Sequence, residues 1–338
     1  MIQFTIWEEK QPNKGEDAPP SLLIREQAQG LLAVYDGLSQ PEALFSVSPT
    51  VENETQELYS QGYVAARLAK TITEGFFNHA ELDDNFAENL EYSLKDDFGT
   101  YLRAQFGIEE TPLFTKPFPT TIAGMYVRPL SPTQWQTIAF WAGNSRCYAL
   151  TTLGLQQLTQ DDINPSPDLL ESLLGNQPDA KIYNYINSMG DFQLQASSYT
   201  LAGPLVLIAA TDGCYQGFEH NLYFEYTLLK TLFESDDLAQ WQNTLTQVLL
   251  QSSNDDFSLS LWASPTLDSL THLKVMLFAR YQKLTRELIQ PLEALDQTLQ
   301  SLRYEAAYLQ MKIEQIDEER RQTAQNLLQQ LGGNSLTP

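Results

Sequence analysis

Hydrophobic residues in the first 265 positions fall into short apolar runs separated by longer stretches with helical periodicity. The runs are rich in β-branched, aromatic and aliphatic residues and are bounded by Gly, Pro, Asn or Asp, as is typical of strands. They are Leu31–Tyr35, Thr121–Val127, Thr137–Ala142, Arg146–Leu150, Leu205–Ala209 and Phe257–Trp262. Helices do not separate these strands evenly. We therefore expect layers of antiparallel strands with helices packed outside, not a doubly wound parallel sheet.

Two amphipathic helices are predicted between the first and second of these strands. In each, apolar side chains recur at intervals that place them on one helix face. The first set is Leu58, Ala65, Leu68, Ile72 and Phe76, and the second is Phe86, Leu90, Leu94, Phe98 and Leu102. A polar segment, Glu81–Asn85, separates the two helices.

From about Leu270 the apolar residues follow the alternating four- and three-residue spacing of a coiled-coil seam. The seam consists of Leu288, Leu292, Leu295, Leu299, Leu302, Ala306, Leu309, Ile313 and Ile316. Pro291 is expected to bend or interrupt this helix, and Gly332 and Gly333 to end it. Self-association, an intramolecular helical hairpin and an amphipathic helix folded back on the globular core all fit the pattern. We predict a globular domain over 1–265, a helical coiled-coil extension over 270–331 and a flexible tail over 332–338.

The 338 residues carry 43 acidic and 20 basic side chains, a net charge of -23. This charge argues against nucleic acid as a partner, would repel an anionic membrane surface, and suits divalent cations. The longest apolar run, Pro204 to Ala210, is too short to span a bilayer, and the N-terminal segment lacks the pattern of a signal peptide. Cys147 and Cys214 are too few for a disulfide framework. We expect a soluble, cytoplasmic protein without a membrane partner.

Candidate chemistry is concentrated in carboxylates at strand ends. The three histidines lie outside any zinc-binding or triad-like context, and there is no GxSxG, Walker or GxGxxG motif. The acidic pairs are Asp36-Gly37, Asp212-Gly213, Asp255-Asp256 and Glu16-Asp17. Such carboxylates, brought together, repel one another unless cations lie between them, and hard oxygen ligands suit Mg²⁺ or Mn²⁺. A single Asp-Gly pair is more often a turn, whereas two that each follow an apolar strand indicate a metal site.

The order of six segments resembles the metal-dependent (PPM, or type 2C) protein serine/threonine phosphatases. These segments are KGEDA, LLAVYDG, PTTIAGMYV, TIAFWAGNSRCYALTTLGLQQLTQDD, LVLIAATDG and DDFSLSLW. Members of that family show NED or MED, DG-x-GG, GTTA, VGDSR leading into LT-x-DH, TDG and DN-x-(S/T), in the same order. The resemblance spans about residues 1–263 and leaves the heptad segment outside.

The resemblance implies an α+β fold, a four-layer αββα sandwich of two antiparallel sheets flanked by helices, here followed by a long C-terminal helix or coiled coil. It also implies two Mn²⁺ or Mg²⁺ ions that activate water to hydrolyse phosphoserine and phosphothreonine. Asp36 would bridge the ions, with the Gly37 carbonyl on one of them. Asp212 and Asp255 would bind the other, and Glu16 would reach the site through metal or bound water, with Asp17 beside it. Asp36, Asp212 and Glu16 are the expected catalytic residues.

Three departures from the family pattern bear most directly on the chemistry. Leu38 stands where a histidine or methionine is usual, so no side chain there can protonate the leaving alkoxide. Asn144 replaces the aspartate that binds a weaker third metal in related enzymes. Pro12 replaces a phosphate-binding arginine, for which Lys14 or Lys10 is the expected substitute, although lysine lacks the bidentate fork of arginine.

Two functions therefore follow from the sequence. The first is an active metal-dependent phosphatase whose partner is a phosphorylated protein in a signalling process. The second is a catalytically weak or inactive pseudophosphatase that acts as a scaffold through its coiled coil, with a coiled-coil partner or a second copy of itself. All four principal metal positions are retained, and we favour the enzyme. An acidic structural protein with unrelated Asp-Gly turns would require the order of the segments to be chance.

Overall fold

Ten strands form two five-stranded antiparallel sheets in a computed structural model of the protein. The structure describes residues 2–11, 14–25, 29–38, 44–47, 57–79, 83–106, 118–164, 181–218 and 220–332. The first sheet has the order β1 (Gln3–Glu8), β12 (Phe257–Ala263), β11 (Val206–Ala210), β8 (Arg146–Thr151) and β9 (Gly154–Gln157). The second has the order β10 (Gln195–Ala202), β7 (Gln134–Ala142), β6 (Ile122–Ser131), β3 (Gly30–Tyr35) and β2 (Ala18–Ile24). A separate hairpin pairs β4 (Leu44–Val47) with β5 (Glu57–Ser60).

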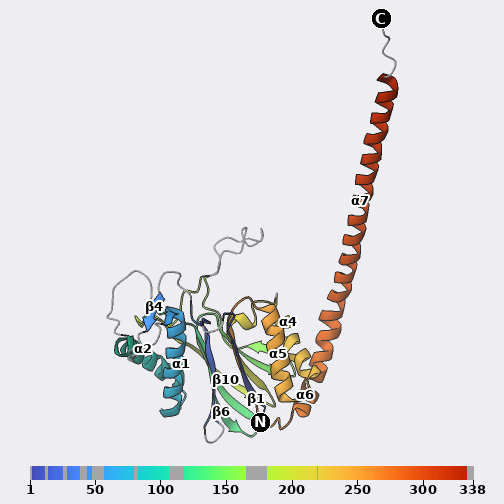
Figure 1. Ribbon diagram of the computed structural model, residues 1–338. Coiled ribbons are helices and arrows are strands. Elements are labelled where there is room, and N and C mark those ends of the chain that lie inside the picture. The colour runs from blue at the N-terminus through green and yellow to red at the C-terminus, as the bar shows by residue number, and fades with distance from the viewer. Residues whose placement is uncertain are drawn as a thin grey trace. The chain divides into compact units, whose positions relative to one another are not determined.

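The central strands are buried on both faces because each sheet is covered on both sides. All residues of β3, β11 and β12 are buried. Between the sheets lies a cluster that includes Leu32, Met125, Trp135, Leu207 and Trp262. The predicted sandwich of two antiparallel sheets flanked by helices is confirmed, with α1 and α2 on one side and α4 and α5 on the other (Figure 1).

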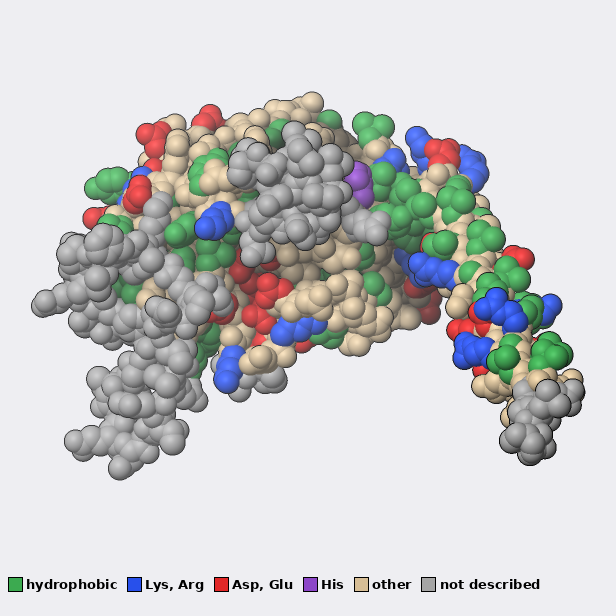
Figure 2. Space-filling view, turned by 90° about the horizontal axis from the view of Figure 1, so that it is seen from above, with side chains coloured by type: hydrophobic (Ala, Val, Ile, Leu, Met, Phe, Trp, Pro, Cys, Tyr) green, Lys and Arg blue, Asp and Glu red, His purple; other side chains and the backbone are tan. Residues whose placement is uncertain are grey.

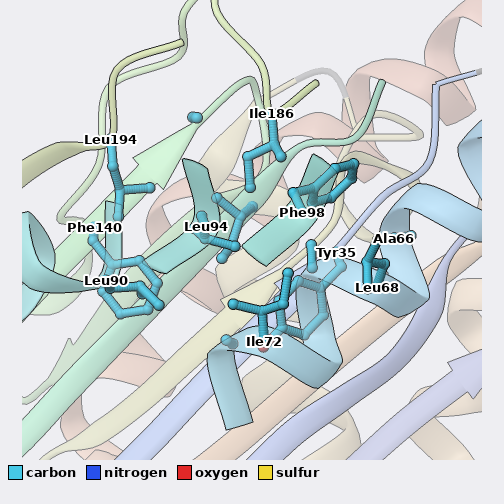
Figure 3. Packing of buried hydrophobic residues seen from close by; sticks show 14 of the residues in the cluster. Tyr35, Ala66, Leu68, Ile72, Leu90, Leu94, Phe98, Phe140, Ile186 and Leu194 are labelled. Atoms are coloured by element: carbon cyan, nitrogen blue, oxygen red, sulfur yellow. The ribbon is translucent and has the colours of Figure 1, made fainter. Parts of the chain in front are cut away.

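The two predicted helices correspond to α1 (Gln61–His79) and α2 (Phe86–Phe106). Their apolar faces pack on the outer face of the second sheet, where Ile72, Leu90, Leu94 and Phe98 surround Tyr35 and Phe140 (Figure 3). One assigned helix position was wrong. Leu58 lies in β5, before the helix begins at Gln61.

Six strands had no counterpart in the sequence prediction. Two of them, β4 and β5, form the separate hairpin, and the other four, β1, β2, β9 and β10, belong to the sandwich. Each of these four mixes polar with apolar residues, and all four lie at sheet edges, where one side of the strand remains unpaired. In β10 the burial alternates between half-buried and exposed positions along its whole length. The helices α4 (Asn221–Glu234) and α5 (Leu238–Ser252) cover the first sheet.

The chain divides into two compact units, Met1–Tyr281 and Gln282–Pro338. The first unit extends beyond residue 265, because most of α6 (Leu270–Leu284) belongs to it. Leu273 and Leu277 are fully buried, and Arg280 donates to the buried Glu225 of α4 at 2.6 and 2.7 Å. Of the predicted tail 332–338, residues 333–338 lie outside the described part of the chain.

The described part of the second unit contains the end of α6, a π-helical turn, η3 (Thr285–Ile289), and the 43-residue helix α7 (Gln290–Gly332). Pro291 does not interrupt the helix. The wider turn just before it, in which the Gln290 N–H donates to the Thr285 carbonyl, accommodates the ring and the missing donor. Because α7 is continuous, it contains no helical hairpin. Within the described ranges, no helix combines the length and apolar composition needed to cross a membrane.

Candidate active site

The predicted site residues lie at one end of the two sheets. Asp36 follows β3, and Glu16 and Asp17 precede the neighbouring strand β2. Asp212 opens the 3-10 turn η2 (Asp212–Cys214) after β11, and Asp255 precedes the neighbouring strand β12. In an antiparallel pair the end of one strand lies beside the start of the other, and this brings four distant segments to one end of the sandwich. Acidic side chains gather in the middle of the face seen in Figure 2.

Two glycines allow these segments to approach closely. A Cβ on Gly37 would lie 2.3 Å from the Gly62 carbonyl oxygen of α1 and 2.9 Å from the Glu16 carbonyl oxygen. A Cβ on Gly213 would lie 2.0 Å from the carbonyl oxygen of Asp256. In each Asp-Gly turn the backbone therefore lies in contact with the backbone of another acidic segment: Gly37 with Glu16, and Gly213 with Asp256. Any side chain at position 37 or 213 would collide with backbone atoms, so glycine is needed at both positions for this close approach.

A buried hydrogen-bond relay joins the ends of the two sheets. The Thr211 hydroxyl donates to Asp17 Oδ2 at 2.8 Å and accepts from the Ser258 N–H at 2.8 Å. Asp17 is only 2% exposed, and the indole N–H of Trp7 donates to its backbone carbonyl. Thr211 thus holds the carboxylate of one sheet against the backbone of the other. Its position directly before Asp212 was the available sequence signal for this role.

The carboxylates of the site raise one another's pKa. Burial raises the pKa of Asp36, and repulsion from Asp212 and Asp17 adds to the rise. Asp255 adds a smaller repulsion. Burial also raises the pKa of Asp17, although its bond from Thr211 opposes the rise. The structure therefore brings the predicted residues at positions 17, 36, 212 and 255 within electrostatic reach of one another.

Asp212 has the best defined surroundings of the four. Burial raises its pKa to about 6, and repulsion from Asp255 contributes. Its Oδ2 accepts hydrogen bonds from Asn144 Nδ2 at 2.7 Å and from Gln216 Nε2 at 2.5 Å. The bond from Asn144 stabilises the ionised form of Asp212, and the positive charge of Arg146 also does so. Gln216 was not singled out in the sequence, although it lies one helical turn after Asp212.

Asn144 is 8% exposed, and its amide connects Asp212 to a second group of polar residues. Its Oδ1 is buried and has no hydrogen-bond partner, while its backbone carbonyl accepts from the Tyr215 hydroxyl. The Tyr215 ring packs against the Arg146 guanidinium, 3.9 Å from the ring centroid. Arg146 forms a bidentate pair with Asp161, with its shortest contact at 2.6 Å. The segment GNSR therefore directs the Asn144 amide to Asp212, and the Arg146–Asp161 pair holds the segment in place.

Asp162, beside Asp161, fixes the same turn from the other side. Its Oδ2 accepts from the Gly143 N–H at 3.1 Å and from Asn184 Nδ2 at 2.6 Å. Asp162 is 4% exposed, so the carboxylate organises the turn and does not face solvent. Asp162 occupies the position of the histidine in the LT-x-DH segment of the family that the sequence resembles. Here its role is to hold the turn through these two hydrogen bonds.

Asp256 braces the loop that carries Glu16. Its two carboxylate oxygens accept from the backbone N–H groups of Lys10 and Glu16, both at 2.7 Å. Glu16 is half-buried, and its backbone is fixed beside the site by this bond. Asp255 is exposed. Partial desolvation raises its pKa, and the charge of Lys10 partly offsets that rise.

The lysine predicted to bind substrate, Lys14, is exposed in the loop between β1 and β2, where its N–H donates to the Gln11 carbonyl. Lys10 is the lysine whose charge acts on Asp255. A third cation, Arg67 of α1, acts on Asp17 and donates to the Gly15 carbonyl at 3.4 Å. Arg67 carries no local sequence signal for this role, because it lies in a helix that is far along the chain from the acidic segments.

The chemistry of these residues fits a hard divalent cation. The carboxylates destabilise one another when ionised, and the buried Asn144 Oδ1 is an oxygen donor without a partner. Within the described ranges, no three His, Cys, Asp or Glu side chains form a group that could hold a metal ion. The Asn144 and Gln216 bonds to Asp212 occupy one of the oxygens such an ion would use.

Comparison with solved structures identifies the architecture. A bacterial serine phosphatase superposes with a TM-score of 0.55 at 18% identity, covering 78% of this chain and 98% of that one. Serine/threonine phosphatase Stp1 from Staphylococcus aureus gives 0.54 at 20% identity, covering 78% and 95%. The chain has the PPM phosphatase fold.

PppA, a key regulatory component of T6SS in Pseudomonas aeruginosa, shares this PPM fold with a TM-score of 0.51 at 16% identity, covering 77% of this chain and 96% of that one. No protein-family model and no curated protein matches the sequence. The structures therefore confirm the PPM-type architecture predicted from the order of the six segments, and the activity is a separate question.

Proposed function

We propose that the protein is a metal-dependent phosphatase that hydrolyses phosphoserine and phosphothreonine in proteins. The observation that carries this proposal is the group of carboxylates at positions 17, 36, 212 and 255, held at one end of a PPM fold although they repel one another. Such an arrangement is costly for a protein that never binds a cation there. It is expected where cations bind.

Asp36, Asp212, Asp255, Glu16 and the Gly37 carbonyl would hold two Mn²⁺ or Mg²⁺ ions. Such ions supply positive charge for a phosphoryl group and lower the pKa of a water molecule. Asp17 and Asn144 would orient the ligands through the bonds that already fix Thr211 and Asp212. Lys14 or Lys10 would contact the substrate phosphate as a point charge.

Leaving-group protonation cannot come from position 38. Leu38 is half-buried, has no titratable group, and is fixed by a bond from its N–H to the Pro119 carbonyl. Water would then protonate the leaving alkoxide, or the reaction would be slower. This requirement favours substrates with acidic leaving groups, so an aryl phosphate should react faster than a phosphothreonine peptide.

The test is phosphate release from a chromogenic aryl phosphate and from a phosphothreonine peptide, with Mn²⁺ and with chelator. We expect turnover that requires Mn²⁺, and a loss of kcat/KM on the order of 100-fold in Asp212→Asn. Asp96→Asn, an identical change at an exposed position of α2, is the matched control and should retain full activity.

Calorimetry with Mn²⁺ separates the alternatives. Mn²⁺ binding without turnover in the wild-type protein would support the pseudophosphatase scaffold. The absence of both Mn²⁺ binding and turnover would reject the metal site itself.

A further inference from the structure

The helix α7 carries a continuous apolar stripe that no other described residue of its own unit covers. Its seam residues from Leu295 to Ile316 are between 45% and 65% exposed, apart from the small Ala306, which is also exposed. Leu292, at the start of the stripe, is half-buried. The stripe is therefore the predicted heptad seam, and it is available for a partner.

The helix has few means of standing alone in water. Within the described residues, α7 carries two intrahelical ion pairs, Arg320–Asp317 at 3.9 Å and Arg321–Glu318 at 3.5 Å, both near its C-terminal end. Exposed pairs of this kind contribute little to stability. A 43-residue helix with an apolar seam is instead typical of a coiled-coil strand, which gains its stability from burial against another helix.

The seam is complementary to itself. In a parallel, in-register pair every layer places a residue against its own copy, and all eight layers from Leu292 to Ile316 are then apolar. Position a is occupied by Leu292, Leu299, Ala306 and Ile313, and position d by Leu295, Leu302, Leu309 and Ile316. Leucine predominates at d, as is common in two-stranded coils.

The flanking charges agree with the same register. In a parallel pair, position g of one helix lies beside position e five residues further along the other. This places Lys312 beside Asp317 of the second copy, twice by symmetry. The other pairs of this kind, Thr298 with Arg303 and Glu305 with Gln310, contain no like charges. An antiparallel pair would place g beside g and e beside e, which separates Lys312 from Asp317.

We propose that the occupant of this seam is a second copy of the chain, and that α7 forms a parallel, in-register, two-stranded coiled coil over residues 292–316. The dimer rests on the seam alone and is independent of the proposed phosphatase activity. It resolves the alternatives left by the sequence in favour of self-association.

Sedimentation equilibrium of the full chain at micromolar concentration tests the oligomeric state. We expect twice the chain mass of 38.3 kDa for the wild-type protein. Leu302→Glu, in a d position, should return the mass to that of one chain. Tyr304→Glu, at an outward position that is 78% exposed, is the matched control and should leave the dimer intact. Near-ultraviolet circular dichroism of each variant checks that the sandwich stays folded.

Orientation is tested by disulfide crosslinking. Leu299→Cys should crosslink to itself under mild oxidation, because in-register a positions face each other. Gln297→Cys, on the outer face, should not. A monomeric or trimeric wild-type protein would overturn the proposal. So would crosslinking that occurs only when Leu299→Cys is mixed with Leu309→Cys, since that result means an antiparallel pair. Mass doubling that survives Leu302→Glu would place the contact elsewhere and would also reject the seam.

Discussion

The Thr211 hydroxyl donates a 2.8 Å hydrogen bond to the buried carboxylate of Asp17, although 194 residues separate the two along the chain. The same oxygen accepts from the Ser258 N–H. One side chain thus fixes the start of β2 in one sheet against β12 in the other, directly beside the acidic site. The stability of the sandwich and the placement of the site residues therefore depend on the same contact.

Thr211→Val tests this contact. Valine keeps the shape of threonine but leaves Asp17 and the Ser258 N–H without partners in a buried region, so the free energy of unfolding should fall by about 2–3 kcal/mol. Urea denaturation measures the change. Thr71→Val is the control, because the Thr71 hydroxyl is exposed and bonds only within its own helix, to the Arg67 carbonyl. A Thr211→Val protein as stable as the control would show that the relay contributes little.

Gly213→Ala tests the close approach of two acidic turns. The new Cβ would lie 2.0 Å from the Asp256 carbonyl oxygen, so one of the turns must move. We expect a loss of about 2 kcal/mol or more in unfolding free energy and weakened Mn²⁺ binding by calorimetry. Gly75→Ala in α1, where a Cβ meets nothing within 4 Å, should be neutral or slightly stabilising. Equal behaviour of the two variants would contradict the packing at Gly213.

The raised carboxylate pKa values predict how stability depends on pH. A carboxylate whose pKa is raised on folding binds more protons in the folded state, so its stabilising contribution is complete at low pH and is lost as pH rises through the folded pKa. For Asp212 that value is about 6. In metal-free buffer we therefore expect unfolding free energy to increase by about 1–3 kcal/mol between pH 7.5 and pH 5.

Thermal and urea unfolding across this range measure the effect. Asp212→Asn should remove much of the increase, and Asp96→Asn should retain it. Saturating Mn²⁺ at pH 7.5 should add about 2.7 kcal/mol at a hundredfold excess over its Kd, because the ion binds only the folded state. A stability that instead falls steadily from pH 7.5 to pH 5 would contradict the mutual repulsion of the carboxylates.

Asn144→Asp tests the amide contact on Asp212. The substitution exchanges a hydrogen-bond donor at 2.7 Å for a negative charge, so the metal-free protein should lose about 1–2 kcal/mol at pH 7.5. The added carboxylate should also strengthen cation binding and introduce a further Mn²⁺ site in calorimetry. A Mn²⁺ titration identical to that of the wild-type protein would contradict the alignment of this segment with the third-metal aspartate of the PPM phosphatases.

Truncation tests where the globular unit ends. A chain that stops at residue 287 keeps all of α6 and should give the near-ultraviolet spectrum of the folded sandwich. A chain that stops at residue 269 loses the buried Leu273 and Leu277 and leaves Glu225 without Arg280. Removing one member of a buried pair costs about 3–5 kcal/mol, so this shorter chain should be strongly destabilised or unfolded. Equal stability of the two truncations would place the boundary near residue 265, as first predicted.

The sequence by itself determined the elements whose pattern is strong and local. The apolar runs that became β3, β6, β7, β8, β11 and β12 are buried on both faces, and burial of that kind leaves a continuous apolar signal. The helical spacing from Phe86 to Leu102 was equally readable, as was the heptad seam of α7. The order of the six segments was sufficient to predict the PPM fold, because their spacing along the chain shows which strand ends carry acidic residues.

Tertiary structure decided what depends on contacts between distant segments. The edge strands β2 and β10 carry weak patterns because one side of each is unpaired, and α6 belongs to the globular unit through buried leucines and the Arg280–Glu225 pair. Arg67, Gln216 and Thr211 reach the acidic site only because the sheets stack and the turns meet. Such contacts depend on the three-dimensional packing of segments that are far apart in the chain. Local periodicity contains no information about them.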